Sequence, residues 1–209
     1  MSPAIARSSR RTSRLEQKVH ERTRELRNAN SKLVELATTD PLTGLCNRRA
    51  FSDSFERLYN HAVERRSDLA VLMMDLDGFK PVNDKLGHDT GDELLKLTAN
   101  TLRENCRSYD VAARLGGDEF VVLMPQVDEA TAETVANQIL EQFQARTTEL
   151  LEGNELISVV SMSIGLSFLK RHAPDNREHL INLADKALYS AKGSGKACLV
   201  IYHPGKVAA

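Results

Sequence analysis

Residues 114–120 read Arg-Leu-Gly-Gly-Asp-Glu-Phe, and this stretch decides the fold of the chain around it. Strand-like apolar runs lie on both sides of it, so it predicts a hairpin. Glycine reaches the positive φ angles of a two-residue turn and lets a ligand approach the backbone, which makes Gly116 and Gly117 the predicted turn and a binding surface. Asp118 and Glu119 then stand at the mouth of the turn, where carboxylates can hold a metal ion.

Further carboxylates follow a strand upstream. Residues 69–74, Leu-Ala-Val-Leu-Met-Met, form an unbroken apolar run typical of a strand buried on both faces, and the run ends at Asp75-Leu76-Asp77. Carboxylates at the exit of a buried strand are costly unless they are paired or bound to metal. If this strand lies beside the hairpin, Asp75 approaches Asp118, and a hard divalent cation would neutralise both. For Asp77 we expect a structural role, in which its carboxylate caps local backbone donors.

Ordered motifs over most of the chain resemble those of the GGDEF-domain diguanylate cyclases, which join two GTP molecules into cyclic di-GMP. Besides the hairpin, the resemblance rests on residues 40–49 (Asp-Pro-Leu-Thr-Gly-Leu-Cys-Asn-Arg-Arg), 75–84 (Asp-Leu-Asp-Gly-Phe-Lys-Pro-Val-Asn-Asp), 87–92 (Gly-His-Asp-Thr-Gly-Asp), 163–165 (Ser-Ile-Gly) and 189–196 (Tyr-Ser-Ala-Lys-Gly-Ser-Gly-Lys). It implies the palm-like fold of nucleotidyl cyclases.

Composition agrees with such a domain. The chain has 209 residues, 41% of them hydrophobic, and no apolar run approaches the ~20 residues of a membrane span. A net charge of −1 argues against bulk attraction to nucleic acid or to an anionic membrane, so local cationic groups must hold a nucleotide. Three unpatterned cysteines, Cys46, Cys106 and Cys198, indicate a reducing compartment. Since no signal peptide is visible either, we expect a cytoplasmic protein.

The N-terminal part carries a heptad pattern. Between residues 14 and 38, positions four and three apart are apolar except for Arg22, and they comprise Leu15, Val19, Leu26, Ala29, Leu33 and Leu36. This narrow stripe favours a parallel two-stranded coiled coil over a single helix lying on its own domain. We therefore expect a disordered tail at residues 1–13, a coiled-coil signalling helix at 14–38 and the cyclase domain at 39–209. An upstream sensory domain is a candidate partner of the coil.

Hydrophobic periodicity places the remaining elements. Helices are predicted at residues 48–65, 81–86, 89–106, 128–146 and 177–192, and strands at 69–75, 111–115, 120–124, 157–169 and 198–202. This order predicts an α/β (α+β) sandwich with a central mixed sheet flanked by helices, most of them on one face.

The resemblance assigns a metal site to the end of the first strand and the hairpin. It implies that Asp75, the carbonyl of Leu76 and Asp118 bind Mg²⁺ or Mn²⁺, which would activate a 3′-hydroxyl and neutralise a triphosphate. Asp118 and Glu119 would form the catalytic pair. For Glu119 three roles stay open, namely a second ligand, a group that helps to deprotonate the hydroxyl, and a hydrogen-bond acceptor at the strand end.

The resemblance also implies contacts to GTP. Phosphate contacts would come from backbone amides around Gly78 and Phe79 and from three lysines, Lys80, Lys192 and Lys196, each of which would otherwise be a solvated surface residue. Guanine presents N–H donors, so the acceptors Asn83 and Asp92 would read it and reject adenine. Asp92 would equally suit the first turn of a helix and Asn83 a turn. Phe79 and Leu95 would form apolar walls.

A second ligand site is implied by Arg107 and Asp110, whose Arg-x-x-Asp spacing matches the inhibitory product site of relatives. Arginine can contact guanine or phosphate bidentately, and aspartate can accept from guanine. An ion pair at a helix end is the simpler explanation of the same two residues.

Each domain is expected to hold one GTP, so catalysis requires two domains that face each other in a homodimer. Two alternatives remain. A catalytically silent cyclic di-GMP receptor would need no metal carboxylates, and the presence of Asp75, Asp118 and Glu119 argues against it. A related cyclase with another nucleotide product is disfavoured by Asn83 and Asp92.

Overall fold

The computed structural model describes residues 18, 20–27, 29, 32–34 and 36–204. The chain divides into two units, Met1–Thr38 and Thr39–Ala209. In the first unit the described residues are helical, and Leu26, Leu33 and Leu36 leave between 64% and 70% of their surface exposed. Leu15, Val19 and the predicted tail at residues 1–13 lie outside the described residues, so the coiled coil and the tail remain predictions.

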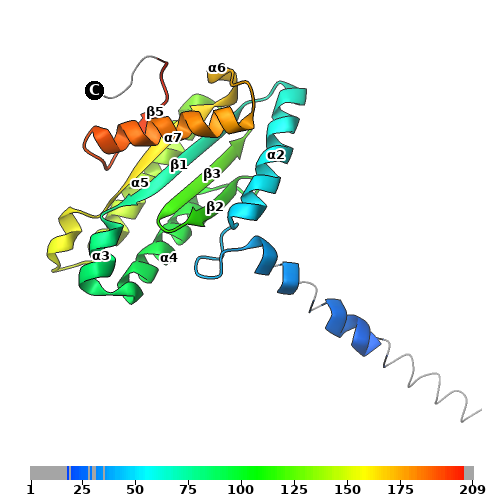
Figure 1. Cartoon of the computed structure of the whole chain (residues 1–209), viewed down its shortest axis with the longest axis horizontal. Helices are drawn as coiled ribbons and strands as arrows, with labels where there is room; N and C mark the ends of the chain where they lie inside the picture. The colour runs from blue at the N-terminus through cyan, green and yellow to red at the C-terminus, as the bar shows by residue number, and fades with distance from the viewer. Residues whose placement is uncertain (1–17, 19, 28, 30–31, 35, 205–209) are drawn as a thin grey trace, which may run out of the picture. The chain divides into compact units, whose positions relative to one another are not determined.

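The second unit contains a five-stranded sheet and helices on its two faces (Figure 1). The strands are β1 (Leu69–Asp77), β2 (Val111–Gly116), β3 (Glu119–Pro125), β4 (Ser161–Phe168) and β5 (Leu199–Ile201). The α-helices are α2 (Arg48–Arg65), α3 (Phe79–Leu86), α4 (His88–Asn105), α5 (Glu129–Leu150), α6 (Leu169–His172) and α7 (Arg177–Gly193). None of the described helices is both long enough and apolar enough to cross a lipid bilayer.

The strand order is β2-β3-β1-β4-β5. Only the pair β4 and β5 among these neighbours is parallel, and the other pairs are antiparallel, so the predicted mixed sheet is confirmed. β1 lies at the centre, where Asp75 stands opposite Glu119 of β3 on one side and Ser163 of β4 on the other. The register therefore brings the acidic end of β1 beside the hairpin of β2 and β3.

Both faces of β1 are buried, because its residues are apolar at almost every position. Alternate residues point to opposite faces. Leu72 and Met74 join a hydrophobic cluster with residues of α4 and α5, and Val71 and Met73 join another with residues of α2 and α7. The expectation that most helices lie on one face was therefore wrong, since a strand that is apolar on both sides must be covered on both sides.

Gly165 of β4 lets helix α7 lie directly on the sheet. A Cβ atom built on Gly165 would stand 2.1 Å from the carbonyl oxygen of Ala184 and 2.2 Å from the backbone nitrogen of Leu188. No side chain fits in that space, so the close packing of α7 depends on glycine. This packing holds the C-terminal part of α7, which carries Lys192, beside the acidic end of β1.

Two local predictions differ from the structure. The strand predicted from residue 157 begins at Ser161, because Glu155–Ser158 forms a 3₁₀ turn in which the Asn154 side chain accepts from the N–H of Leu156. Helix α6 was not predicted at all. Its last residue, His172, accepts a hydrogen bond from the Phe168 N–H at 2.9 Å, a contact that apolar periodicity does not reveal.

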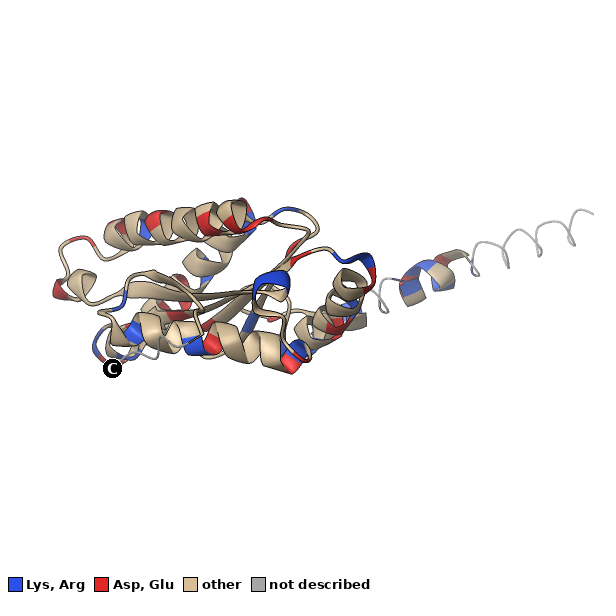
Figure 2. Cartoon of the chain, turned by 90° about the horizontal axis from the view of Figure 1, so that it is seen from above, with Lys and Arg blue, Asp and Glu red and all other residues tan. Residues whose placement is uncertain are grey.

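Charged residues of both signs are spread over the helices (Figure 2).

Candidate active site

The tip of the hairpin is shaped by a register shift. The pairing shifts between Arg114 and Gly116, so Gly116 stands opposite Glu119 and the two turn residues are Gly117 and Asp118. The prediction that Gly116 and Gly117 form the turn was wrong by one residue, because a bulge in β2 moves the register. Gly116 and Gly117 have φ angles of +143° and +55°, which glycine tolerates best. As a result, Asp118 belongs to the turn itself.

A backbone hydrogen bond ties this turn to the end of β1. The N–H of Leu76 donates to the carbonyl oxygen of Asp118 at 3.3 Å. In a strand, the N–H and C=O groups of one residue point to the same neighbour, so the Leu76 carbonyl also faces the hairpin. Asp75, Leu76 and Asp118 therefore meet at one edge of the sheet, as the sequence predicted.

The two carboxylates at this edge interact electrostatically. Burial and the charge of Asp75 raise the pKa of Asp118 above its ordinary value, while Lys192 acts in the opposite direction. The ammonium group of Lys192 lies 2.8 Å from a carboxylate oxygen of Asp75, and the Asp75 side chain is only 15% exposed. Lys192 therefore balances part of the negative charge at the edge.

The donors at this edge suit a hard cation. Two carboxylates and one backbone carbonyl are oxygen donors, and Mg²⁺ is commonly held by one or two carboxylates while it keeps several waters. Within the described part of the chain, no three or more His, Cys, Asp or Glu side chains form a metal cluster. Glu119 instead lies 3.7 Å from Arg48, and its side chain is half exposed. The residues present thus fit an ion held by Asp75, Asp118 and the Leu76 carbonyl, without Glu119.

The segment after β1 prepares a backbone surface. Gly78 has a φ of +76°, and a Cβ there would lie 2.4 Å from the carbonyl oxygen of Val159. Helix α3 begins at the next residue, and the N–H groups of its first turn have no partner within the helix. The backbone amides around Gly78 and Phe79, predicted to contact phosphate, lie at this helix start, and the phosphate contact itself stays a prediction. Lys80 and Lys196 are exposed, and Lys196 lies in the turn after α7 with a φ of +67°.

Two residues predicted to contact guanine lie on neighbouring helices, Asn83 on α3 and Asp92 on α4. A Cβ on Gly91 would stand 1.9 Å from Oδ1 of Asn83, so the amide of Asn83 lies directly against Gly91, next to Asp92. Asp92 also lines a cleft of about 380 Å³ with Asp89, Thr90, Glu93, Lys96 and Leu150. The prediction that Leu95 forms an apolar wall for the base was wrong. Leu95 is 2% exposed and belongs to the core, because it faces the sheet and not this surface, whereas Phe79 is partly buried against the same core.

Comparison with known proteins places this arrangement in a family. Residues 37–198 match the model of the family described as diguanylate cyclase, GGDEF domain. The chain belongs to the GGDEF family. The response regulator PleD of Caulobacter vibrioides is 38% identical over 175 residues, which cover 84% of this chain and 38% of PleD. The diguanylate cyclase DosC of Escherichia coli is 38% identical over 157 residues, covering 75% of this chain and 33% of DosC.

A solved structure shows the same fold. The coiled coil and GGDEF domain of DgcB from Caulobacter crescentus, in complex with c-di-GMP, matches with a TM-score of 0.79 at 29% identity, over 90% of this chain and 98% of that chain. The predicted palm-like fold is thereby confirmed. This chain spans about a third of the length of PleD or DosC.

In this GGDEF domain, the predicted product site is an ion pair. The Arg107 guanidinium donates to both carboxylate oxygens of Asp110 at 3.1 Å, and the Arg107 N–H donates to the same carboxylate at 2.8 Å. The Asp110 side chain is fully buried, whereas that of Arg107 is 33% exposed and lies over the Tyr109 ring at 4.7 Å. Asp110 therefore holds Arg107, and Arg107 alone of the two presents a surface.

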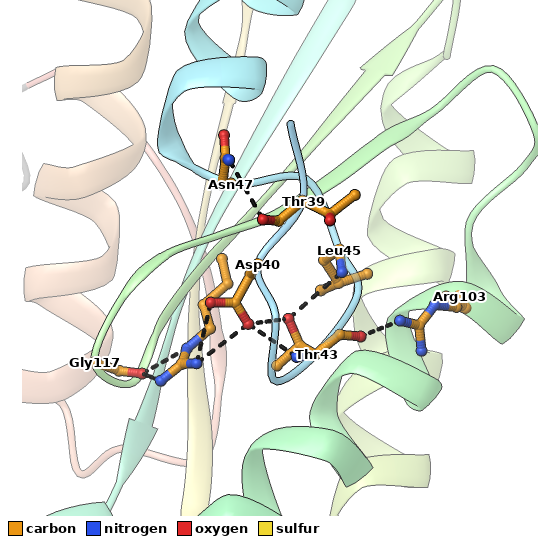
Figure 3. Close-up of polar contacts among 8 residues, drawn as sticks. Thr39, Asp40, Thr43, Leu45, Asn47, Arg103 and Gly117 are labelled. Carbon is orange, nitrogen blue, oxygen red and sulfur yellow. Dashed lines mark hydrogen bonds and ion pairs between the residues drawn. The ribbon is translucent and has the colours of Figure 1, made fainter. Parts of the chain in front are cut away.

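Sequence reasoning missed three residues that hold the hairpin of the GGDEF domain. Arg114 donates to the Gly117 carbonyl and pairs with Asp40, and Arg48 donates to the Leu115 carbonyl at 2.9 Å (Figure 3 shows the first two contacts). Asp40 and Arg48 occur in a motif that the sequence singled out, but nothing in the motif reveals its partner in the hairpin.

Proposed function

We propose that this chain is a diguanylate cyclase, which condenses two GTP molecules into cyclic di-GMP and releases two pyrophosphates. The observation that supports this most directly is the meeting of Asp75, the Leu76 carbonyl and Asp118 at the end of β1. Membership of the GGDEF family and the similarity to diguanylate cyclases support the same reaction. GTP as the substrate would place the activity in the cytoplasm.

Asp75, Asp118 and the Leu76 carbonyl would hold Mg²⁺ or Mn²⁺. When bound, the ion neutralises the triphosphate and lowers the pKa of the attacking 3′-hydroxyl. The carboxylate of Glu119 faces Arg48 and solvent, which leaves it available to assist removal of the hydroxyl proton. Asp118 and Glu119 thus divide ligand and proton-transfer roles between neighbouring residues of the hairpin.

Lys192 pairs with Asp75 in the structure. Its flexible stem would also let the ammonium reach the triphosphate of a bound GTP, so that Lys192 would contribute positive charge at both places. Lys80 and Lys196 are exposed and would add charge around the phosphates. Gly116 and Gly117 near the tip of the hairpin and the amides at the start of α3 would allow the phosphates to approach the backbone.

Asn83 and Asp92 would read guanine. Their acceptor oxygens match the N1–H and amino donors of guanine, whereas a bound adenine would cover these acceptors without offering them a donor. Gly91 supports this role because its missing side chain lets the amide of Asn83 lie against α4 at the residue that precedes Asp92. Phe79 supplies an apolar contact for the base, and Leu95 supplies the core behind it.

Two such domains must face each other, since the hydroxyl of one GTP attacks the phosphate of the other. A homodimer through residues 14–38 is supported by the exposed Leu26, Leu33 and Leu36, which a second helix would cover. An upstream sensory domain could then set the geometry of the pair.

We also propose product inhibition through Arg107. Asp110 fixes its guanidinium, and the exposed side of that group can contact the guanine or phosphate of cyclic di-GMP.

The test is incubation of the purified protein with GTP and Mg²⁺, with the product identified by chromatography and mass. Cyclic di-GMP is expected from the parent and from a Glu141→Ala control, an exposed acid on α5, but not from Asp118→Ala. No product from a folded dimer that binds added cyclic di-GMP would refute the cyclase and favour a receptor. A different cyclic nucleotide would refute the assigned guanine contacts.

A further inference from the structure

One arginine connects the turn of the hairpin to the beginning of the domain. The Nε and Nη2 groups of Arg114 donate to the carbonyl oxygen of Gly117 at 2.9 and 2.8 Å. Its Nη1 group lies 3.2 and 3.4 Å from the two carboxylate oxygens of Asp40 (Figure 3). The Arg114 and Asp40 side chains are 13% and 20% exposed, so solvent reaches little of the pair.

Asp40 is itself held in a closed turn. Its Oδ1 accepts from the N–H of Thr43 at 2.9 Å and from the Thr43 hydroxyl at 2.6 Å (Figure 3). The backbone of the turn closes through Asp40 N–H to Leu45 O at 2.8 Å and Gly44 N–H to Asp40 O at 2.7 Å. Burial opposes ionisation, but the Thr43 hydrogen bonds and the Arg114 charge hold the pKa of Asp40 below its ordinary value, so it stays ionised.

The same turn is attached to the rest of the domain on two sides. The N–H of Cys46 donates to Ala112 O at 3.2 Å, and the N–H of Arg114 donates to Cys46 O at 2.9 Å, which docks the segment along β2. On the other side, Arg103 of α4 donates to the carbonyl of Thr43 (Figure 3). Residues 39–46 therefore form a fixed platform for the Arg114 side chain.

The acceptor that Arg114 holds is the peptide joining Gly117 to Asp118. Gly117 has a φ of +55°, and glycine has wide conformational freedom, so this peptide could rotate without an external contact. Two parallel N–H donors to one carbonyl restrict that rotation. The orientation of this peptide determines the position of the Asp118 backbone, and hence the position of the Asp118 carboxylate relative to Asp75.

We propose that Asp40 and Arg114 are positioning residues that set the orientation of the Gly117–Asp118 peptide, so that the metal-binding edge depends on the platform formed by residues 39–46. The inference rests on the proposed function for its metal site. Arginine is required because its planar fork reaches the Gly117 carbonyl and the Asp40 carboxylate at the same time, which a lysine ammonium cannot do. We call the contacts of Arg114 with Asp40 and Gly117 the clamp. Thr38, the last helical residue of the N-terminal unit, is covalently joined to the platform, so the clamp is a route by which that helix can affect the site.

The test compares Asp40→Asn, Arg114→Lys and the double variant with the parent. Arg177→Lys is the matched control, because Arg177 pairs with Glu56 and Glu178 away from the hairpin. Calorimetry measures the dissociation constant of 3′-deoxy-GTP from each protein in the presence of Mg²⁺. This analogue lacks the attacking hydroxyl and cannot turn over. Amide hydrogen exchange reports the mobility of residues 115–119.

Both single variants are expected to weaken binding of the analogue at least fivefold and to speed exchange at residues 115–119. The double variant should be no worse than Arg114→Lys, because both changes break one chain of contacts. Binding and exchange within twofold of the parent, or losses that multiply in the double variant, would overturn the clamp. If the parent binds the analogue yet makes no cyclic di-GMP, the proposed function fails, but the binding and exchange of the variants still test the clamp. If the parent does not bind it, exchange alone decides.

Discussion

Replacing Asp77 with alanine should destabilise the domain strongly, although this residue lies outside the proposed metal site. Asp77 ends β1 and is 4% exposed. Its Oδ2 accepts from the hydroxyls of Ser161 at 2.9 Å and Ser163 at 2.8 Å, both on β4. The expectation that it caps backbone donors was thus correct in assigning a structural role and wrong about the donors, which are side chains of the neighbouring strand.

The magnitude follows from these two hydrogen bonds. A hydrogen bond to a charged group contributes roughly 1.5–3 kcal/mol, so losing both removes at least about 3 kcal/mol from the free energy of unfolding. For a domain of this size, 1 kcal/mol corresponds to roughly 2–4 °C in melting temperature. The Asp77→Ala protein should therefore melt at least about 6 °C lower. Urea denaturation measures the free energy, and Asp53→Ala, an exposed acid on α2, should change it by less than about 0.5 kcal/mol.

A rescue distinguishes lost hydrogen bonds from lost packing. Part of the cost is the burial of two serine hydroxyls without an acceptor, and replacing both partners by apolar groups can be nearly neutral. Adding Ser161→Ala and Ser163→Ala to Asp77→Ala should therefore restore part of the lost stability. A loss below about 1 kcal/mol in Asp77→Ala, or a triple variant less stable than the single one, would refute the reasoning.

Two further predictions concern titrating groups. Burial and the charge of Asp75 raise the pKa of Asp118, so its ionised form destabilises the fold at neutral pH, and Asp118→Asn should melt higher than the parent but gain nothing from Mg²⁺. A lower melting temperature would contradict this. His172 accepts from the Phe168 N–H, lies 3.0 Å from the Tyr202 carbonyl through Nε2, and has a pKa lowered by burial. Its contribution is therefore complete above pH ~6.5 and is lost as the pH falls through the folded-state pKa. The parent should lose more unfolding free energy than His172→Gln between pH 7.5 and 5.5, and equal losses would disprove this role.

Local sequence determined the strands, the hairpin and the acidic end of β1. These features depend on patterns only a few residues long. One is an unbroken apolar run followed by carboxylates, and the other is a pair of glycines between β-prone segments. Such short patterns set the local backbone preference and burial. The same locality explains the errors. The turn lies one residue later than expected because a bulge depends on pairing with β3, and the 3₁₀ turn at Glu155–Ser158 replaces strand because of a side-chain cap.

Tertiary structure decided which polar groups meet. Asp40 and Arg114 are 74 residues apart in sequence, and Asp77 and Ser163 are 86 apart, so no periodicity joins them. The sequence by itself established the GGDEF motifs and the carboxylates available for a metal. Only the folded chain showed that Lys192 pairs with Asp75 and that Glu119 faces Arg48. The physical reason is that side-chain pairing depends on sheet register and helix packing, which arise when distant segments are buried together.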